Sequence, residues 1–316
     1  MKRVEENNSN PSPEDIKKNC IFCKIISKDI PSKIIETEKE FIATLDVNPA
    51  SEGHTLIVPT QHLPVFPMLG PEIIGKLGVF VKKTSQKILQ NLGAKGTTIL
   101  IPSGTAAGQQ SPHAIAHIIP RYEADDVGIK PEPTQNPEQK EFLTKISQGL
   151  GLTIEKEEIL VQDDDLTAVV PNQAVATGEI QIIPNAEYTI LEQIPEELLQ
   201  KMFQISMKLK STLFDILQPT GTTLLIQNGV PSGQTEKKFK IRIIPRYEND
   251  NLDLNIKNKQ TDPAKINEIY TKFQNTIEYE SSENKQNQTH ETTNQQKETE
   301  LDTDEDYLIK ALKRNV

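Results

Sequence analysis

The feature that most constrains the fold is an internal repeat, in which residues 35–125 match residues 160–250 at a constant offset of 125 without a gap. KGTTILIPSGTAAGQ (95–109) aligns with TGTTLLIQNGVPSGQ (220–234), and IIPRYEADD (118–126) aligns with IIPRYENDN (243–251). A single offset that keeps GTT, GQ and IIPRYE in register indicates a tandem duplication. The 316 residues also leave room for two domains of ordinary size.

Each copy has a mixed pattern of strands and one long helix. In the first copy, residues 55–59, 97–102 and 113–119 are rich in β-branched residues and bounded by Gly, Pro or Ser, which predicts strands. Residues 72–92, after Pro71, carry an apolar stripe at helical spacing, and the stretch after Pro195 repeats it. The predicted fold is therefore α+β, with two mainly antiparallel units that pack as a pseudo-dimer within one chain.

Composition shifts set the expected boundaries. Residues 130–140 are rich in proline and polar residues, as linkers are, and residues 281–300 have almost no apolar content, which predicts disorder. Asp262 and Pro263 resemble a helix N-cap and first helical position. The expected segments are a disordered N-terminus (1–18), a first unit (19–128), a linker (129–140), a second unit (141–255), an amphipathic helix (256–280) and a disordered acidic tail with a short terminal helix (281–316).

The charge and hydropathy argue against some classes of partner, although a local basic site is compatible with the net charge. The net charge of −10 argues against coating a nucleic acid, which normally requires a basic surface. No apolar run approaches the roughly 20 residues needed to span a bilayer, and the polar N-terminus lacks the apolar core of a secretory signal. We therefore expect a cytosolic protein without a membrane partner, and the acidic tail is its candidate surface for a protein partner.

The chain has only two cysteines, Cys20 and Cys23. Two cysteines at this short spacing cannot form a disulfide framework, so a metal site, a redox pair or two buried thiols are the alternatives. A redox pair normally opens a helix after a strand, and NCIFCKI does not clearly do so.

CIFCKIISKDIPSKIIETEKEFIATLDVNPASEGHTLIVPTQH, followed by GTAAGQQSPHAIAHIIPR, resembles the histidine triad (HIT) family. The resemblance covers residues 19–125 and extends to the second copy through the repeat. It implies a nucleotide-binding hydrolase or transferase, in which the middle histidine of His-x-His-x-His attacks the α-phosphate.

In one branch of that family, two cysteines and two histidines bind a structural zinc ion. The matching positions here are Cys20, Cys23, His62 and His113. Two thiolates and two imidazoles are suitable ligands for a closed tetrahedral Zn²⁺ site. The second copy has Lys145, Gln148, Glu187 and Lys238 at the same positions, so all four ligands are missing together. The resemblance and this loss as a set predict one zinc ion, in the first copy.

The triad is degenerate in the first copy, because Ile115 stands at the nucleophile position. On a strand, His113, Ile115 and His117 would share one face. Isoleucine has no lone pair for nucleophilic attack, and His117 is displaced by about 6–7 Å along the strand. The usual chemistry of the family is therefore not expected.

Other positions match the family's nucleotide-binding residues. The resemblance makes Asp46 the ribose-binding acid and Gln109 a contact of the α-phosphate, whereas Ser103 replaces the usual asparagine. A turn or loop-capping role is an equal alternative for Asp46 and Ser103. His117 is either a phosphate donor or a satisfied, half-buried histidine. We expect His54 to be structural and His290 to belong to the tail.

The second copy replaces the triad with Lys238, Lys240 and Arg242 and places Phe239 and Ile241 toward the core. Asn228 and Gln234 match the family's phosphate-contacting amides, and with these cations they form a candidate anion site. Pro171 replaces the ribose acid. The favoured interpretation is simpler, namely that the cations are solvated on an exposed strand.

The leading hypothesis is a cytosolic tandem HIT protein with one structural Zn²⁺ that binds a nucleotide or related phosphate without hydrolysing it. One alternative is a surviving nucleotide phosphohydrolase or nucleotidyltransferase activity. Another is a non-enzymatic interaction scaffold that recruits a partner through the C-terminal tail.

Overall fold

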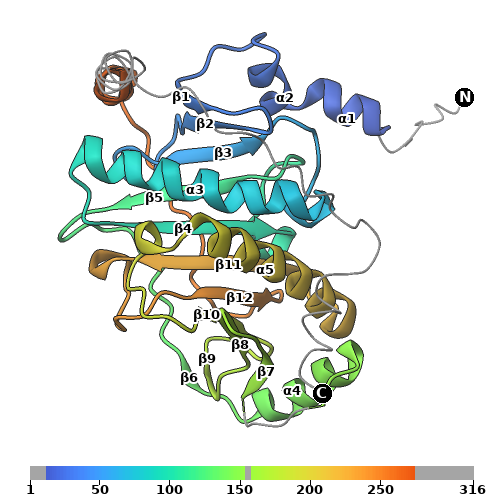
Figure 1. Cartoon of the computed structure of the whole chain (residues 1–316). Coiled ribbons are helices and arrows are strands. Elements are labelled where there is room, and N and C mark those ends of the chain that lie inside the picture. Colours follow the sequence, from blue (N-terminus) through green and yellow to red (C-terminus); the bar gives the residue numbers. More distant parts are fainter. Residues whose placement is uncertain (1–11, 154–157, 275–316) are drawn as a thin grey trace, which may run out of the picture.

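A computed structural model describes residues 12–153 and 158–274. Both copies contribute to one antiparallel sheet of ten strands, in the order β1-β2-β3-β5-β4-β11-β12-β10-β8-β7 (Figure 1). The first unit contributes β1 (Ile34–Thr37), β2 (Phe41–Leu45), β3 (Thr55–Pro59), β4 (Gly96–Ser103) and β5 (Ala116–Arg121). The second unit contributes β7 (Ile159–Gln162), β8 (Leu166–Val169), β10 (Ile180–Pro184), β11 (Gly221–Asn228) and β12 (Ile241–Arg246). The predicted α+β class and internal pairing of two units are confirmed.

The two units join where β4 pairs with β11, in a register that places Ser103 opposite Thr222 and Thr97 opposite Asn228. Both strands begin with a glycine of the repeated GTT motif. A Cβ atom on Gly96 would lie 2.4 Å from the Asn228 carbonyl oxygen, and one on Gly221 would lie 2.7 Å from the Ala107 amide nitrogen. Glycine is therefore required at both positions by the close approach of the opposite unit's backbone.

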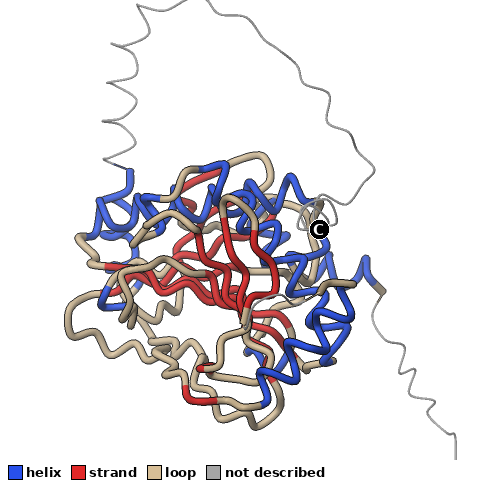
Figure 2. The backbone as a smooth tube through the Cα atoms, turned by 60° about the horizontal axis from the view of Figure 1, so that its bottom comes forward, coloured by secondary structure: helices blue, strands red, loops and turns tan. Residues whose placement is uncertain are grey.

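One face of the sheet is covered by two long helices, α3 (Pro71–Leu92) and α5 (Glu196–Leu217), which lie side by side (Figure 1). They approach closely because α3 has a glycine at the contact, Gly78, whose Cβ would lie 2.7 Å from the Phe203 ring. Buried side chains from both units, including Phe80 and Met202, belong to one hydrophobic core. In Figure 2 most helices gather on one side of the strand layer, and loops cover the other.

Each unit is followed by a segment that crosses to the other unit. After the first unit, residues 126–137 include β6 (Thr134–Gln135), which pairs with β9 (Gln173–Ala174), and lead into α4 (Glu138–Leu150) on the second unit. After the second unit, residues 251–262 return to the first, where the Lys259 amide donates to the Pro49 carbonyl. They end in helical residues 263–274, whose Ile266, Ile269 and Phe273 are buried. Each crossing segment packs on the opposite unit, so the two segments together hold the units against each other.

The structure corrects several expected boundaries. Residues expected to be disordered form α1 (Pro13–Asn19), which begins with a capping box between Ser12 and Asp15. The expected linker 129–140 contains β6 and the start of α4. Strand β5 begins at Ala116, not at residue 113, because the chain before it follows an irregular loop. The expected tail with its terminal helix (281–316) lies outside the described residues.

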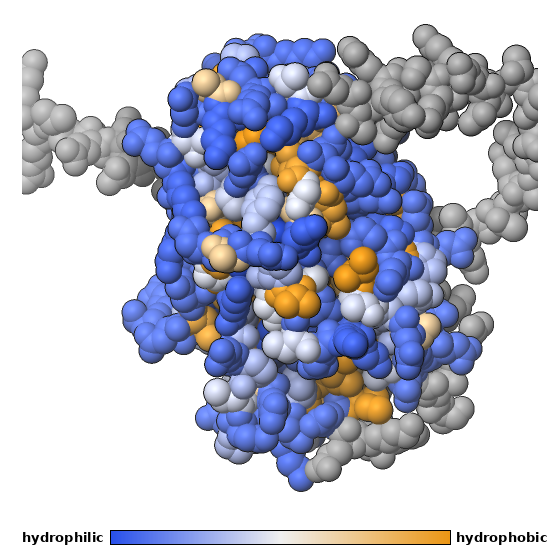
Figure 3. Space-filling model, turned by 90° about the vertical axis from the view of Figure 1, so that its left-hand side faces the viewer, coloured by the Kyte–Doolittle hydropathy of each residue, from blue (hydrophilic) through white to orange (hydrophobic). Residues whose placement is uncertain are grey.

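The remaining short elements are helix α2 (Ile21–Ile26) and four 3₁₀ turns, η1 (Phe66–Met68), η2 (Thr105–Ala107), η3 (Leu191–Gln193) and η4 (Val230–Ser232). None of the helices within residues 12–153 and 158–274 has the length and apolar character needed to cross a bilayer. On the face shown in Figure 3, hydrophobic side chains lie in separate groups among hydrophilic ones. That face therefore does not present one broad apolar surface.

Candidate functional site

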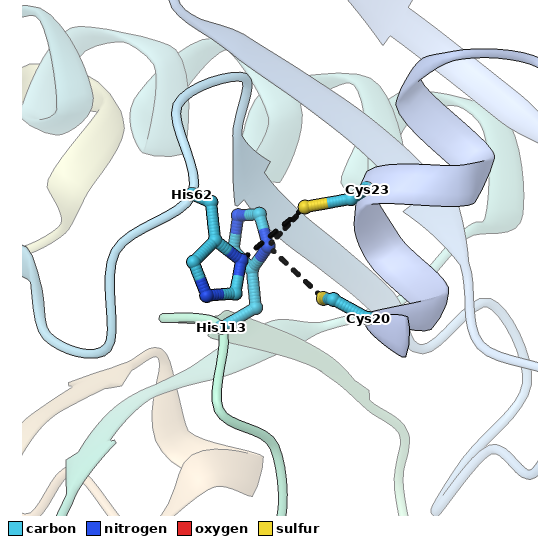
Figure 4. A group of neighbouring side chains, drawn as sticks. All are labelled: Cys20, Cys23, His62 and His113. Carbon is cyan, nitrogen blue, oxygen red and sulfur yellow. Dashed lines mark hydrogen bonds between the residues drawn. The ribbon is translucent and has the colours of Figure 1, made fainter. Parts of the chain in front are cut away.

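The four expected zinc ligands meet at one point (Figure 4). Cys20 lies between α1 and α2, Cys23 lies in α2, His62 follows β3, and His113 precedes β5. Cys23 Sγ lies 3.2 Å from His62 Nδ1 and 3.7 Å from His113 Nδ1, and Cys20 Sγ lies 3.5 Å from His113 Nδ1. A tetrahedral zinc ion holds sulfur and nitrogen ligands about 3.6 Å apart. The donor set and its spacing therefore fit Zn²⁺.

The surroundings of His113 favour a metal on Nδ1. Its Nε2 lies 2.9 Å from the Pro59 carbonyl oxygen, which can only accept a hydrogen bond. Nε2 therefore carries the proton, and the Nδ1 lone pair points toward the two sulfur atoms. Burial lowers the pKa of His113, which keeps the imidazole neutral. A metal-binding histidine typically has this arrangement, with its other nitrogen held by a backbone carbonyl.

The Cys23 thiol does not have the character of a reactive cysteine. Burial, together with the neighbouring Cys20, raises the pKa of Cys23 to about 11. Reactive cysteines have a lowered pKa, because the thiolate is the nucleophile. Metal coordination would supply the positive charge that deprotonates these sulfur atoms.

The second unit has no such cluster at the equivalent positions that the structure describes. Lys145, at the position of Cys20, pairs with Glu141 on the surface of α4, and Lys238, at the position of His113, is exposed.

A cavity of about 290 Å³ lies beside the zinc-ligand cluster. All three positions of the degenerate triad line it, although His113 and Ile115 precede the strand. Ile115 also packs against Ile42, Leu56 and Val58. The wall includes residues from both units: Asp46, Leu56, Leu100, Gln109, Ser111, Thr223, Leu254, Asn255, Ile256 and Asn258. The crossing segment 251–262 therefore completes a cavity that belongs mainly to the first unit.

Asp46, His54 and His117 form a second cluster on this cavity. Nε2 of His54 lies 3.2 Å from Nδ1 of His117, and Nδ1 of His54 lies 3.5 Å from an Asp46 carboxylate oxygen. Burial lowers the pKa of both histidines to about 3, so both rings are neutral at physiological pH. His54, which we expected to be merely structural, thus contacts His117, which lines the cavity.

Two expected phosphate contacts have other roles in the structure. Gln109 lines the cavity, but its amide accepts from Gly104 N and donates to the carbonyls of Pro64 and Ser111, which braces the loop. Ser103 is absent from the described cavity wall, and its hydroxyl accepts from the buried Lys210 of α5 at 2.8 Å. The sequence had indicated neither Ser111 nor Asn255 as a polar group of this cavity.

The cationic residues of the second unit are not a solvated row. Arg242 is 5% exposed and donates to both carboxylate oxygens of the buried Glu179, at 2.7 and 3.1 Å. Lys240 pairs with Glu236 at 2.8 Å, and only Lys238 is fully on the surface. The favoured interpretation of solvated cations is therefore wrong for Arg242, while the predicted burial of Phe239 and Ile241 is confirmed.

The second unit also has a cavity, of about 750 Å³, lined by Lys130, Gln227, Gln234, Lys238, Lys240 and Arg242 among others. Asn228 is not among its described lining residues, because its amide is buried at the joint of the two units and bonded to Glu192, Thr97 and the Leu191 amide. Gln234 braces its loop through Gly229 N and Thr189 O, as Gln109 does in the first unit.

Comparison with known proteins gives a consistent result. The family model described as HIT domain matches residues 27–124 and 153–249. An uncharacterized HIT-like protein of Methanocaldococcus jannaschii is 39% identical over 127 residues, which cover 40% of this chain and 98% of that protein. An adenylylsulfatase of Arabidopsis thaliana is 34% identical over 110 residues, 35% of this chain and 56% of that protein.

The tandem arrangement itself has a counterpart among solved structures. A galt-like protein from Arabidopsis thaliana superposes over 75% of this chain and 84% of its own length, with a TM-score of 0.54 and 16% sequence identity. This similarity concerns the fold alone, and it extends across both units.

Proposed function

The chain belongs to the HIT family of nucleotide-binding hydrolases and transferases, and we propose that its first unit binds a nucleotide or related phosphate without the usual covalent step. The main support for this proposal is the position of Ile115. It lines the cavity between His113 and His117, at the position where the family's nucleophile would stand, and presents hydrocarbon only. A cavity that can hold the ligand but offers no nucleophile at that point is suited to binding.

We propose that Cys20, Cys23, His62 and His113 hold a structural Zn²⁺ ion. Four protein ligands leave no open coordination position, as is usual in structural sites. The ion would tie the α1–α2 segment to the loops that carry His62 and His113. It would also fix His113, and with it the adjacent wall of the nucleotide cavity.

The cavity offers chemically distinct walls for the parts of a nucleotide. The Asp46 carboxylate is suited to accept hydrogen bonds from ribose hydroxyls. Ser111 and His117 provide polar groups near Ile115, and Leu56, Leu100, Leu254 and Ile256 provide apolar surface for a base. We assign the phosphate to the part of the cavity wall that contains Ser111 and His117. Ser103 and Gln109 keep their observed hydrogen bonds, to Lys210 and to the loop backbone respectively.

The same function is not assigned to the second cavity. Arg242 and Lys240 already have carboxylate partners, and Pro171 stands where the first unit has Asp46. We propose that the second unit serves the first by completing its sheet and its cavity wall. The anion site first considered for Asn228, Gln234, Lys240 and Arg242 would require these partners to be displaced.

Isothermal titration with AMP tests this function in the full chain. We expect binding, and we expect Asp46→Ala to weaken it about tenfold or more, as for the loss of a hydrogen bond to a charged group. Asp126→Ala is the control, because Asp126 is exposed and pairs with Lys259. Absence of AMP binding, or equal affinities of the two variants, would contradict the proposed site.

A surviving phosphohydrolase is the second candidate, because His117 leaves one imidazole on the cavity wall. Zinc coordination by Cys20 and Cys23 requires both cysteines to be reduced, which is consistent with our proposal of a reducing compartment such as the cytosol. Recruitment of a protein partner through residues 281–316 stays a prediction, since those residues lie outside the described structure.

A further inference from the structure

The His54–His117 contact requires one nitrogen to donate and the other to accept. The two atoms, Nε2 of His54 and Nδ1 of His117, are 3.2 Å apart. A neutral imidazole carries one proton, so the nitrogen that donates in this contact leaves the opposite nitrogen of its own ring bare. Which ring donates therefore determines what His117 presents to the cavity.

The backbone of Ala50 decides the direction. Its amide N–H points at Nδ1 of His54 over 3.2 Å, and an amide nitrogen can only donate. Nδ1 of His54 must then be bare, and the proton lies on Nε2. The Asp46 carboxylate is farther from the same nitrogen, at 3.5 Å, and makes no hydrogen bond to it within the described contacts. His54 is thus a donor to His117.

The tautomer of His54 determines the tautomer of His117. Because Nδ1 of His117 accepts from His54, the single proton of His117 lies on Nε2. Building on the nucleotide-binding function proposed above, we infer that His54 is a positioning residue that fixes His117 as a hydrogen-bond donor toward the ligand. The group facing His117 is then an acceptor, such as a phosphate oxygen. The same tautomer withholds the Nε2 lone pair that a nucleophile would need.

The second unit shows the same positions with a different partnership. Glu179 replaces His54 and Arg242 replaces His117 at the repeat offset, and the carboxylate accepts two hydrogen bonds from the guanidinium. Arginine can only donate, so its partner must accept. The polarity of the pair therefore differs between the units, because the residue at the position of His54 donates in the first unit and accepts in the second. The Glu179–Arg242 pair also shows that the fold accommodates glutamate at this position.

A metal ion between the rings is the competing arrangement. Asp46, His54 and His117 bring three ligand atoms within 4.8 Å of one another, and two imidazole nitrogens on one zinc ion lie about 3.4 Å apart. The distance between the rings therefore fits both cases. The Ala50 amide distinguishes the hydrogen-bonded arrangement from the metal-bound one. Its N–H occupies the Nδ1 lone pair of His54, so the proton of that ring lies on Nε2, which is then unable to bind a metal.

Nitrogen-15 NMR of the imidazole rings in the ligand-free, zinc-loaded chain tests the tautomers directly. We expect His54 and His117 both to show a bare Nδ1 and a protonated Nε2 at neutral pH. A protonated Nδ1 on His117 would overturn the inference. A second equivalent of zinc that is lost in Asp46→Ala would overturn it as well, in favour of the metal arrangement.

A pair of variants tests the effect on the ligand. In His54→Gln the side-chain amide can still donate to His117, whereas in His54→Glu the carboxylate can only accept. We expect AMP affinity to fall no more than about threefold in H54Q and at least about tenfold in H54E, in line with one hydrogen bond to a charged group. Adenosine, which lacks the phosphate, should bind both variants alike.

Rescue separates hydrogen-bond polarity from added charge. H54E/H117R copies the Glu179–Arg242 pair, restores the wild-type net charge with neutral histidines, and returns a donor to the cavity. We expect it to bind AMP about tenfold more tightly than H54E. Equal losses in H54Q and H54E would overturn the inference. If wild type does not bind AMP at all, the proposed function fails, and the tautomer measurement still tests the relay.

Discussion

Arg242 donates to Glu179 through Nε and Nη2, at 2.7 and 3.1 Å, from the position that His117 holds in the first unit. Glu179 holds the position of His54. The second unit has therefore replaced a pair of neutral rings on a ligand cavity with a buried ion pair. Glu179 also accepts from the Val175 amide and from Gln181, so its carboxylate organises the start of β10.

Removing one member of this pair should destabilise the chain strongly. Glu179→Ala would leave Arg242 buried without its carboxylate, and we expect the free energy of unfolding to fall by about 3–5 kcal/mol. Urea unfolding at pH 7 measures this loss. Asp253→Ala is the control, because Asp253 forms an exposed pair with Lys257; we expect a change within about 0.5 kcal/mol. A loss in E179A no larger than in the control would contradict the structural role of the pair.

Zinc removal should act on the first unit. Purified protein should contain one zinc ion per chain, and Cys20→Ser should release it and lower the melting temperature, because the folding of a structural site is coupled to its metal. Lys145→Ser, at the repeat position of Cys20, is the matched control. Elemental analysis and thermal melting give both readings. A zinc-free wild type, or a C20S protein that melts like wild type, would refute the site.

Lys210 predicts a pH-dependent stability. Its Nζ is buried among Ser103 Oγ and the Ile101 carbonyl, and burial lowers its pKa to about 7 from the usual 10.5. Between these values the unfolded chain holds a proton that the folded chain lacks, so this group's contribution to stability rises with pH. Below pH 7 both states are protonated, and the cost of burying the charge is greatest.

Lys210→Met removes this dependence. We expect K210M to be more stable than wild type at pH 7, and its advantage to shrink by on the order of 3 kcal/mol by pH 9.5. Comparing urea unfolding of the two proteins at both pH values cancels the contributions of the other titrating groups. An advantage that is the same at both values would show that Lys210 stays charged in the folded protein.

The repeat made most of the fold predictable. Matching GTT and IIPRYE stretches fixed the equivalence of β4 with β11 and of β5 with β12, and Pro71 and Pro195 marked where the long helices begin. The four zinc ligands were placed together by the resemblance, and the structure brings them together. The first crossing segment was read as a linker, and residues 251–255 were assigned to the second unit, because segments whose contacts lie with the opposite unit leave no local periodicity. The helical residues 263–274 were predictable from their own apolar stripe and from Asp262 and Pro263.

Site residues were less predictable where a side chain has two uses. Gln109 and Ser103 stand at phosphate-contacting positions, but a glutamine amide also satisfies loop backbone groups, and Ser103 accepts from Lys210 of the other unit. The role of His54 depends on the Ala50 amide, four residues away, whose direction only the folded backbone sets. Asn255 reaches the cavity from the other copy, so no local motif indicates it.

A phosphorus NMR time course tests most directly whether binding survives without chemistry. The full chain is mixed in turn with a diadenosine polyphosphate and with an adenosine phosphoramidate. The structure predicts shifted or broadened ligand signals that persist for hours, because Ile115 offers no nucleophile. New mononucleotide peaks that disappear in His117→Ala would contradict this, since they would show that His117 carries out the reaction.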